Sequence, residues 1–422
     1  MHRRDLEAAP ADVIRARQLD RLDRLLDAIL PHNRFYAAKL GHLERPITWE
    51  TFRTLPFTTK EELVADQAEE PPLGTIATYA HDRYAVYHQT SGTTGRPLTV
   101  LDTAESWNWW AESWQYVYRG AGVTERDRVF FAFSFGPFIG FWSAYAGART
   151  LGALTVPGGA MNSATRLAMI RHTGASVLVS TPTYALRLAE VAKAEGHAIR
   201  EGTIRITIHA GEPGASIPAT RRRIEEAWNA RCFDHAGATE IGAYGYSCAM
   251  QDGLHANEEE FIVEVLAPDG RPVAPEETGE LVVTNLGRPG WPAIRYRTGD
   301  LVTLGDRQCP CGRTFLKLPG GLLGRSDDLI IHKGVNIYPS SIESIVREFE
   351  VHEFRLVRTR RAAIEDLELE VESTPETAAA LANRILERLA VRIACRVVDR
   401  DSLPRWELKA RRVTDRREEN AP

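Results

Sequence analysis

The stretch Gln89-Thr90-Ser91-Gly92-Thr93-Thr94-Gly95-Arg96-Pro97 gives the strongest clue to the architecture of this chain. It follows residues 83–88, whose pattern predicts a strand, so we expect a loop that leaves the end of that strand. The glycines let backbone N–H groups approach an anion closely, and the hydroxyl side chains add donors for phosphate oxygens. No Gly-Lys-Ser/Thr follows the second glycine, which excludes a Walker loop. By itself the stretch fits a polar surface turn equally well.

Later segments would suit the same anionic ligand. Asp234-His235-Ala236-Gly237-Ala238-Thr239-Glu240 sets a hydroxyl beside a carboxylate, a pair suited to holding Mg²⁺ on a nucleotide. Tyr296-Arg297-Thr298-Gly299-Asp300 predicts a tight turn whose carboxylate would accept two ribose hydroxyls. Gly324-Arg325-Ser326-Asp327-Asp328 follows and leads into residues 329–339. Together these segments indicate a nucleotide.

In this order, the segments resemble those of the adenylate-forming enzymes: acyl-CoA synthetases, aryl-acid ligases and peptide-synthetase adenylation domains. Within that superfamily the chain is most similar to the phenylacetate–CoA ligase branch, because of Leu55-Pro56-Phe57-Thr58-Thr59-Lys60 and of Leu403-Pro404-Arg405 followed by Lys409. The resemblance runs from about residue 30 to about residue 415. It implies that ATP and Mg²⁺ activate a carboxylic acid to an acyl-AMP, which then passes to CoA.

Composition agrees with an ordinary globular enzyme. The chain has 422 residues, 43% of them apolar and 26% charged, with a net charge of −5. This balance gives no reason to expect a nucleic acid or a membrane as partner, and no apolar run is long enough to span a bilayer. The N-terminus lacks the apolar core of a signal peptide, so we expect a cytoplasmic protein. The oligomeric state is left open, with a homodimer as one alternative.

The order of predicted elements indicates an α/β fold with two domains. Strands and helices alternate over residues 128–208, which predicts a mostly parallel sheet covered by helices on both faces. From about residue 256 the strands alternate in the antiparallel manner. We therefore expect a large domain over residues 1–326, with a β-rich subdomain at about 256–323. The resemblance implies that residues 327–422 form a small mobile α+β lid. The aromatic residues at 107–116 have helical spacing, and we expect them in the core.

The resemblance assigns a role to each nucleotide motif. The loop from Thr90 to Gly95 would hold the β- and γ-phosphates, and Thr239 with Glu240 would hold magnesium. Asp300 would take the ribose hydroxyls, and Arg325 would contact ribose or phosphate. A capping threonine, a surface acid and an ion-paired arginine are the plainer alternatives. The residues implied for binding ATP or CoA are Thr90, Ser91, Gly92, Thr93, Thr94, Gly95, Gly211, Glu212, Pro213, Asp234, His235, Ala236, Asp300, Arg325 and Gly334.

The resemblance also implies roles for Lys409 in adenylation and for Asp327 and Gly334 in the change to the second half-reaction. Lys409 would place a positive charge between the carboxylate and the α-phosphate during adenylation, although it also begins a plain basic run. Asp327 would be the hinge about which the C-terminal domain turns, and Gly334 would let the thiol pass closely. For Lys60, a solvated lysine at a helix start is the preferred interpretation, and a phosphate ligand is the alternative.

Two positions depart from the family pattern. Ala236 stands where the family has an aromatic residue that stacks on adenine, so stacking would come from His235 or Tyr244, or adenine would be held more loosely. Leu408 stands where the family has glycine before the C-terminal lysine, which weakens the assignment of Lys409. Neither change removes a charged group that the chemistry needs.

Three of the five cysteines, together with one histidine, suggest a metal site. Cys309-Pro310-Cys311 places two thiols on a tight turn, and Cys248 and His255 lie upstream. Three cysteines and a histidine form an ordinary structural zinc set, and some relatives of the ligase branch carry the same arrangement. Reduced, metal-free cysteines are the alternative. A zinc ion with four protein ligands would be structural.

The acid substrate is expected to be aromatic. The pocket residues are aromatic or small, which suits a planar aryl or arylacetic acid. They are Phe135, Gly136, Phe138, Ile139, His209, Ala210, Ala236, Gly237 and Ala238. CoA is the expected acceptor, and a carrier-protein thiol or an amine is the alternative. A non-catalytic nucleotide-binding protein is a further alternative.

Overall fold

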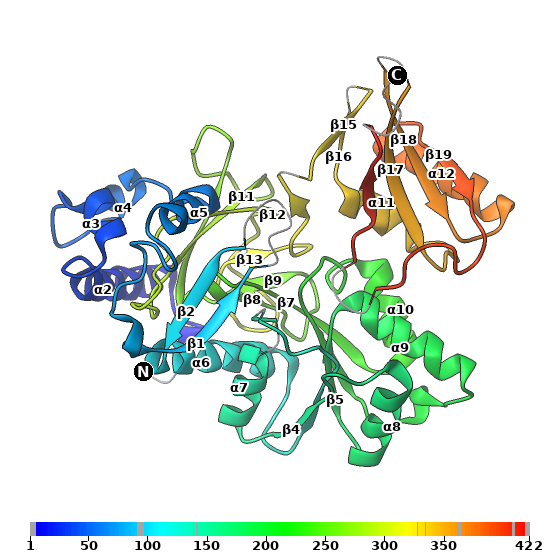
Figure 1. The fold of residues 1–422 in the computed structure, drawn as a ribbon, viewed down its shortest axis with the longest axis horizontal. Helices are drawn as coiled ribbons and strands as arrows, with labels where there is room; N and C mark the ends of the chain where they lie inside the picture. The colour runs from blue at the N-terminus through cyan, green and yellow to red at the C-terminus, as the bar shows by residue number, and fades with distance from the viewer. Residues whose placement is uncertain are drawn as a thin grey trace.

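The computed structural model describes residues 6–90, 97–137, 139–140, 142–326, 328–333, 335–361, 364–406 and 410–417. Nine of the expected site residues lie outside this part of the chain: Ser91, Gly92, Thr93, Thr94, Gly95, Phe138, Asp327, Gly334 and Lys409. Figure 1 shows the described part as a large N-terminal body on which a smaller C-terminal unit rests.

An eight-stranded sheet forms the centre of the large body, in the order β13-β9-β8-β7-β6-β5-β3-β4. Its parallel strands are β3 (Arg128–Phe131), β4 (Leu154–Pro157), β5 (Val177–Ser180), β6 (Ile206–His209) and the first half of β7 (Arg231–Ala238). Its antiparallel edge is formed by β8 (Gly242–Tyr246), β9 (Leu254–Ala256) and β13 (Lys317–Leu318). The expected parallel sheet is thus confirmed.

Helices cover both faces of this sheet, because its strands are apolar on both sides. Alternate residues of β3 and β5 belong to two different cores: Val129 and Val177 to one, Phe130 and Leu178 to the other. The first core takes side chains from α6 (Ala104–Ala121) and α7 (Trp142–Leu151). The second is closed by α8 (Ser163–Thr173), α9 (Pro182–Ala194) and α10 (Pro218–Trp228). Trp109, Trp110, Trp114, Tyr116 and Tyr118 of α6 are buried, as expected, and Trp107 is half-buried.

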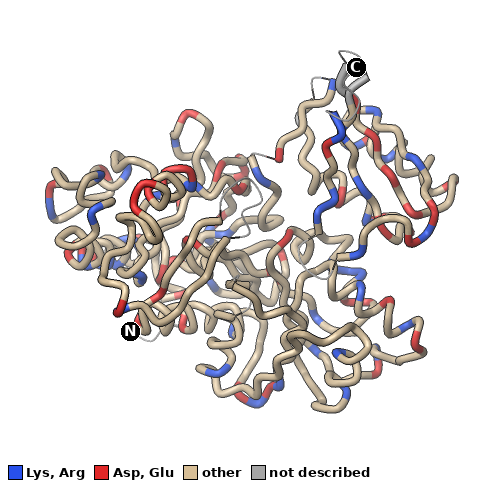
Figure 2. The backbone as a smooth tube through the Cα atoms, viewed as in Figure 1, with Lys and Arg blue, Asp and Glu red and all other residues tan. Residues whose placement is uncertain are grey.

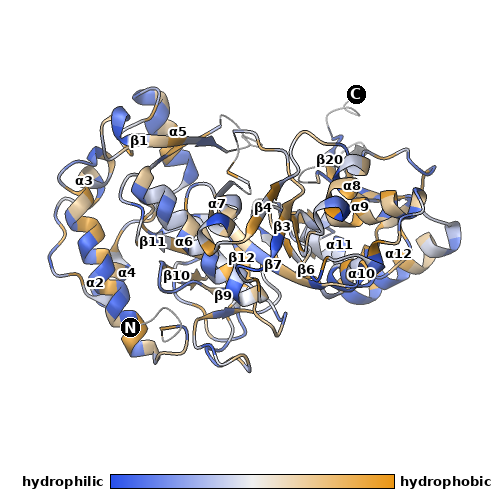
Figure 3. Ribbon diagram, turned by 90° about the horizontal axis from the view of Figure 1, so that it is seen from below, coloured by the Kyte–Doolittle hydropathy of each residue, from blue (hydrophilic) through white to orange (hydrophobic). Residues whose placement is uncertain are grey.

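The N-terminal helices pack against this body. They are α2 (Ala11–Ile29), α3 (Arg34–Leu40), α4 (Trp49–Thr54) and α5 (Lys60–Glu69). Helix α2 carries stripes of opposite hydropathy, and it buries Ile14, Leu22 and Ile29 on its inner side (Figure 3). Helix α5 begins with a capping box, in which Thr59 and Glu62 satisfy each other's backbone N–H groups. This cap fixes Lys60 at the first helical position.

Two further sheets complete the large body. The hairpin of β1 (Tyr84–Gln89) and β2 (Thr99–Thr103) brackets the predicted phosphate loop. A four-stranded antiparallel sheet contains β10 (Phe261–Leu266), β11 (Thr278–Asn285), β12 (Tyr296–Thr303) and β14 (Gly324–Arg325). The antiparallel pairing expected from residue 256 onward is present, but β9 and β13 join the central sheet instead.

The C-terminal unit has a hydrophobic core of its own, which runs from Ile330 to Ile393. Its elements are β15 (Ile330–His332), β16 (Val335–Ile337), α11 (Pro339–Val346), β17 (Phe354–Arg361), β18 (Ile364–Val371), α12 (Pro375–Leu389), β19 (Ala394–Val397) and β20 (Val413–Asp415). Its four-stranded sheet has the order β19-β18-β17-β20. Helix α11 lies against α10 of the large body (Figure 1).

Charge and hydropathy are spread as in an ordinary globular protein. Basic and acidic residues are mixed along both the large body and the C-terminal unit (Figure 2). No helix in the described part of the chain is long and apolar enough to cross a membrane.

Candidate active site

The base of the predicted phosphate loop is closed by Thr90. Its backbone N–H donates to the carbonyl of Leu98 over 2.9 Å, and its hydroxyl accepts the N–H of Leu98 over 3.0 Å. The N–H of Gln89 donates to the carbonyl of Pro137 over 2.8 Å, which ties the loop base to the segment expected to line the acid pocket. The Thr90 hydroxyl therefore accepts a backbone N–H at the base of the loop, and its phosphate contact stays a prediction.

Lys60 lies beside Glu240, one of the residues predicted to hold magnesium, and this favours the alternative interpretation of Lys60 as a phosphate ligand. Its Nζ is 3.7 Å from Oε1 of Glu240, and its side chain is only 30% exposed. The Tyr296 hydroxyl donates to the same carboxylate oxygen over 3.4 Å. The capped start of α5 brings Lys60 here, because that helix begins beside β12: Thr58 pairs with Tyr296 in an isolated bridge. A cation and a carboxylate thus meet where magnesium and phosphates were expected.

A fully buried ion pair supports the neighbouring residue Thr239. Arg288 donates from Nε and Nη2 to the two carboxylate oxygens of Asp102, each over 2.7 Å, and neither side chain is exposed. Its Nη1 donates to the carbonyl oxygen of Thr239 over 2.9 Å. The sequence reasoning missed this pair. The available signal was Asp102 itself, a carboxylate directly after the apolar residues Val100 and Leu101 of a strand.

Asp300 lies in a bulged strand, and the expected tight turn is wrong. Between β11 and β12 the register shifts, so that residues 298–300 of β12 lie opposite a single position of β11. Gly299 has φ +73°, which permits the bulge, and Asp300 then points beside Arg325, its partner on β14. Arg325 Nη1 is 3.7 Å from Asp300 Oδ1, and the Tyr244 hydroxyl donates to Oδ2 over 3.3 Å. The bulge thus places Asp300 and Arg325 together.

Neither His235 nor Tyr244, the two residues suggested to stack on adenine in place of an aromatic residue at position 236, has a ring face open to a ligand. Tyr244 is 1% exposed, and its hydroxyl is committed to Asp300. His235 packs on Trp114, with ring centroids 4.2 Å apart, and its Nδ1–H donates to the Gly245 carbonyl over 2.7 Å. Burial lowers the pKa of His235 to about 4, so the ring is neutral at pH 7. Ala236 is itself buried.

Asp234, at the carboxyl end of the parallel part of β7, is a buried carboxyl group. It accepts hydrogen bonds from the Ser216 hydroxyl and, over 3.0 Å, from the N–H of His235. Burial raises its pKa to about 6, although these hydrogen bonds act in the opposite direction. Gly237 follows on the same strand, where a Cβ atom would lie 2.9 Å from the Gly242 carbonyl oxygen. Glycine is therefore required at that crossing of β7 and β8.

The Gly211-Glu212-Pro213 loop follows β6, but the carboxylate of Glu212 binds protein groups. It accepts the N–H of Thr183 at the start of α9 over 2.9 Å, and the N–H of Ala410 over 2.9 Å. Both oxygens of the Glu212 carboxylate therefore have backbone partners in this structure, and its nucleotide contact stays a prediction.

The expected acid pocket contains an aromatic group at the carboxyl end of β3. The ring of Phe135 lies 4.6 Å from that of Trp142 and 5.9 Å from that of Tyr145, between centroids. The Trp142 Nε1–H donates to the Gly136 carbonyl over 3.0 Å. Trp142 and Tyr145, in the first turn of α7, were not among the pocket residues predicted from the sequence, although they closely follow residues 135–139 in the chain.

His209, expected in the same pocket, is fully buried at the end of β6. Its Nδ1–H donates to the Ser180 carbonyl over 3.2 Å, and burial lowers its pKa to about 4. Its Nε2 has no hydrogen-bond partner among the residues that the structure describes. The ring is therefore a neutral acceptor beside Ala210.

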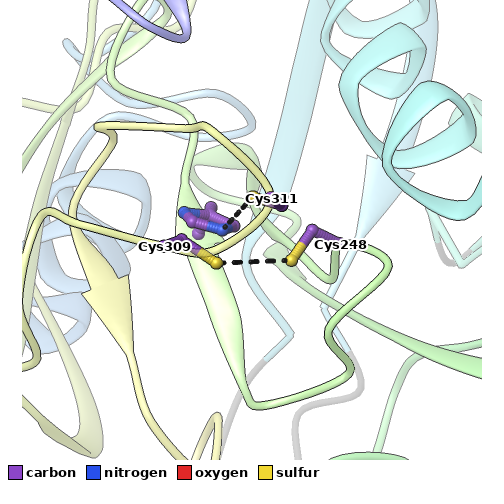
Figure 4. A group of neighbouring side chains, drawn as sticks. Cys248, Cys309 and Cys311 are labelled. Carbon is purple, nitrogen blue, oxygen red and sulfur yellow. Dashed lines mark hydrogen bonds between the residues drawn. The ribbon is translucent and has the colours of Figure 1, made fainter.

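The four predicted metal ligands lie together. Cys248 follows β8, His255 is on β9, and Cys309 and Cys311 are on the loop between β12 and β13, so the set connects the edge of the central sheet to that loop (Figure 4). All four ligand atoms lie within 4.8 Å of one another. The Cys248 and Cys309 sulfurs are 3.8 Å apart, and Cys311 Sγ is 3.6 Å from His255 Nε2.

These distances fit zinc. A tetrahedral ion with bonds of about 2.3 Å to sulfur and 2.0–2.1 Å to nitrogen separates two sulfurs by about 3.8 Å, and sulfur from nitrogen by about 3.6 Å. The Nδ1–H of His255 donates to the Phe315 carbonyl over 3.2 Å, which leaves Nε2 as the metal-facing lone pair.

Comparison with known proteins identifies the family. A model described as AMP-binding enzyme matches residues 37–287, and one described as AMP-binding enzyme C-terminal domain matches residues 334–417. The phenylacetate-coenzyme A ligase of Thermus thermophilus is 31% identical over 384 residues, which are 88% of this chain and 84% of that protein.

Solved structures of one relative support the same family assignment. The 2-hydroxyisobutyryl-CoA ligase in the postadenylation state, with R3-HIB-AMP bound, is 31% identical, with 99% of this chain and 92% of that chain covered and a TM-score of 0.93. The same ligase with 2-HIB-AMP and CoA in the thioesterification state has 32% identity, coverage of 98% and 92%, and a TM-score of 0.75. This chain therefore belongs to the AMP-binding enzyme family, and within it to the AMP-forming acid–CoA ligases that work through an acyl-AMP intermediate.

Proposed function

We propose that this ligase activates an aromatic carboxylic acid, aryl or arylacetic, and transfers it to CoA with release of AMP. The observation that carries the proposal is the aromatic group of Phe135, Trp142 and Tyr145 beside the segment expected to line the acid pocket. Flat rings with centroids 4.6–5.9 Å apart present edges and faces on which a planar acid can pack. The names of the phenylacetate–CoA ligase relatives support the same class of acid.

The first half-reaction joins a carboxylate oxygen of the acid to the α-phosphorus of ATP and expels pyrophosphate. The protein needs to align these groups and to neutralise charge. We assign the phosphates to the loop that Thr90 closes, and magnesium to Thr239 and Glu240, where the ion would neutralise phosphate charge. Lys60, beside Glu240, would bind phosphate oxygens.

The nucleoside would be held from the opposite side of the site. We assign the ribose hydroxyls to Asp300, whose carboxylate is oriented by the Tyr244 hydroxyl and by Arg325. The adenine would lie along the backbone of Gly211 and Ala236. Because no aromatic ring stands at position 236, adenine is held by edge contacts and by backbone more than by stacking.

The second half-reaction requires a different arrangement of the chain. We assign Lys409 to adenylation, residues 327–422 to a mobile lid with Asp327 as its hinge, and Gly334 to the passage of the CoA thiol. The separate hydrophobic core from Ile330 to Ile393 supports this division, because the unit can turn without breaking its own packing.

We assign one structural zinc ion to Cys248, His255, Cys309 and Cys311. Four protein ligands close a tetrahedral shell and leave no position for substrate, so the ion would supply stability. It would fasten the 309–311 loop to the edge of the central sheet. The separations of 3.8 Å and 3.6 Å support this assignment.

A small branched hydroxy acid is the second candidate substrate. It is favoured by the 2-hydroxyisobutyryl-CoA ligase structures, which resemble this chain over its full length. The unpartnered Nε2 of His209 would accept a hydrogen bond from a substrate hydroxyl.

A panel of acids decides between the two classes. Pyrophosphate release is measured with phenylacetate, benzoate and 2-hydroxyisobutyrate, each with and without CoA, and thioester is measured in parallel. The proposal expects the highest kcat/KM for an aromatic acid and thioester with CoA alone. A preference for 2-hydroxyisobutyrate would overturn the aromatic class. Pyrophosphate without thioester would favour a carrier-protein thiol or an amine as acceptor.

A further inference from the structure

Glu212 connects the large body to the C-terminal unit through both of its carboxylate oxygens. Oε1 accepts the N–H of Thr183, in the first turn of α9, over 2.9 Å. Oε2 accepts the N–H of Ala410, which leads into β20, over 2.9 Å. One carboxylate therefore joins two backbone amides that lie 227 positions apart in the sequence, since 410 − 183 = 227.

Arg412 makes a second link across the same junction. Within the C-terminal unit its Nε donates to Glu353 over 2.7 Å and its Nη1 to Glu343 over 2.9 Å. Its Nη2 reaches the Thr183 hydroxyl over 3.2 Å. Burial alone would lower the pKa of Arg412, but the two glutamates raise it above the ordinary arginine value, so the guanidinium stays charged. Both links converge on Thr183, one at its N–H and one at its hydroxyl.

These links belong to one of two arrangements of the chain. The whole chain matches the postadenylation state of 2-hydroxyisobutyryl-CoA ligase with a TM-score of 0.93 and its thioesterification state with 0.75. The ligase is the same in both, so the lower score reflects a different placement of its parts. The Glu212 and Arg412 contacts are therefore features of the arrangement that resembles the postadenylation state.

We propose that Glu212 is a positioning residue for adenylation, which fixes the backbone at Ala410 while Arg412 braces the same junction on Thr183. The inference rests on the proposed role of Lys409, because the amide nitrogen of Ala410 is bonded to the carbonyl carbon of that residue. Holding this amide restricts the backbone that carries the lysine. When the C-terminal unit turns for thioester formation, the Ala410 amide leaves Glu212, so the carboxylate has no part in the second half-reaction.

Glu212→Gln tests this role, because glutamine keeps the shape but offers only one acceptor oxygen. One of the two N–H groups must then face an NH₂ group. Acid-dependent pyrophosphate exchange should fall at least tenfold, whereas thioester formation from synthetic phenylacetyl-AMP and CoA should stay within twofold of wild type. Arg412→Lys, which keeps the charge and loses the reach to Thr183, should shift the ratio of the two rates in the same direction.

The matched control is Glu225→Gln. Glu225 also accepts a backbone N–H, from Cys232 over 3.0 Å, together with the side chain of Gln251, but it lies wholly within the large body. The Glu225→Gln variant should leave the ratio of the adenylation rate to the rate of thioester formation unchanged. Equal losses in both half-reactions for Glu212→Gln, or none in adenylation, would overturn the proposal.

A second readout is independent of the substrate. Hydrogen exchange should show the Ala410 amide protected in the wild-type protein and at least tenfold faster in Glu212→Gln, with other amides of β20 unchanged. If the wild type adenylates no acid but the Ala410 amide exchanges faster in Glu212→Gln, the proposed function is wrong and the contact between Glu212 and Ala410 is supported. Identical hydrogen exchange of the Ala410 amide in the wild type and in Glu212→Gln would show that Glu212 does not hold this amide.

Discussion

Removing the charge of Asp102 should cost more stability than any exposed ion pair of this protein. The guanidinium of Arg288 is fully buried and donates twice to Asp102, over 2.7 Å each. Asp102→Asn keeps the shape of the side chain but leaves a buried positive charge unpaired. Loss of one partner from such a pair costs about 3–5 kcal/mol. Because Arg288 also holds the Thr239 carbonyl, adenylation should fall as well.

The assay is urea unfolding followed by tryptophan fluorescence, since α6, beside Asp102, carries four of the nine tryptophans. The control is Asp20→Asn, which breaks an exposed pair with Arg24 and should cost less than about 1 kcal/mol. Asp102→Leu combined with Arg288→Met removes both charges and should recover most of the loss. A single variant as stable as the control, or a double variant less stable than the single, would refute the reasoning.

The remaining predictions concern the site and the metal. Lys60→Met should lower acid-dependent pyrophosphate release about tenfold or more, with melting temperature unchanged, because the cation beside Glu240 is lost; unchanged release would return Lys60 to a surface role. Cys309→Ser, or chelation, should remove one zinc per chain by metal analysis and lower the melting temperature before activity at low temperature is affected; wild-type protein purified without chelator and lacking zinc would contradict this. Burial raises the pKa of Asp234 to about 6, so its contribution to the unfolding free energy is complete below its ordinary pKa and is lost as pH rises through about 6. In Asp234→Asn the unfolding free energy should therefore fall less between about pH 4 and pH 7, by up to about 3 kcal/mol. If the unfolding free energy of this variant falls as steeply as that of the wild type, the fall is caused by other groups. Lys409→Ala should abolish adenylation while ATP binding and thioester formation from preformed acyl-AMP survive; normal adenylation by this variant would exclude its assigned role.

Short motifs were the part of the candidate site that could be recognised in the sequence. Thr239, Glu240, Asp300 and Arg325 belong to short segments with their own residue order. Thr239 and Glu240 directly follow β7, and Asp300 on β12 pairs with Arg325 on β14. The parallel sheet followed from strand–helix alternation, because that pattern leaves few other ways to bury both faces. These features are local in sequence.

What could not be predicted depends on partners far apart in the chain. The Asp102–Arg288 pair spans 186 positions, and no local pattern distinguishes a buried arginine with a partner from a surface one. The contact of Lys60 with Glu240 could not be predicted for the same reason, since only the packing of α5 beside β12 brings the two residues together. The bulge at Gly299 looked like a turn because glycine in the left-handed region serves both.

The central claim, an aromatic acid passing through an acyl-AMP to CoA, is tested most directly by a single turnover. Enzyme in excess is mixed with radiolabelled phenylacetate, ATP and Mg²⁺, quenched over time, and then chased with CoA. The account predicts phenylacetyl-AMP in stoichiometric yield with pyrophosphate before CoA is added, and its complete conversion to phenylacetyl-CoA and AMP afterwards. Thioester that forms without prior acyl-AMP, or no adenylate from any aromatic acid, would contradict it.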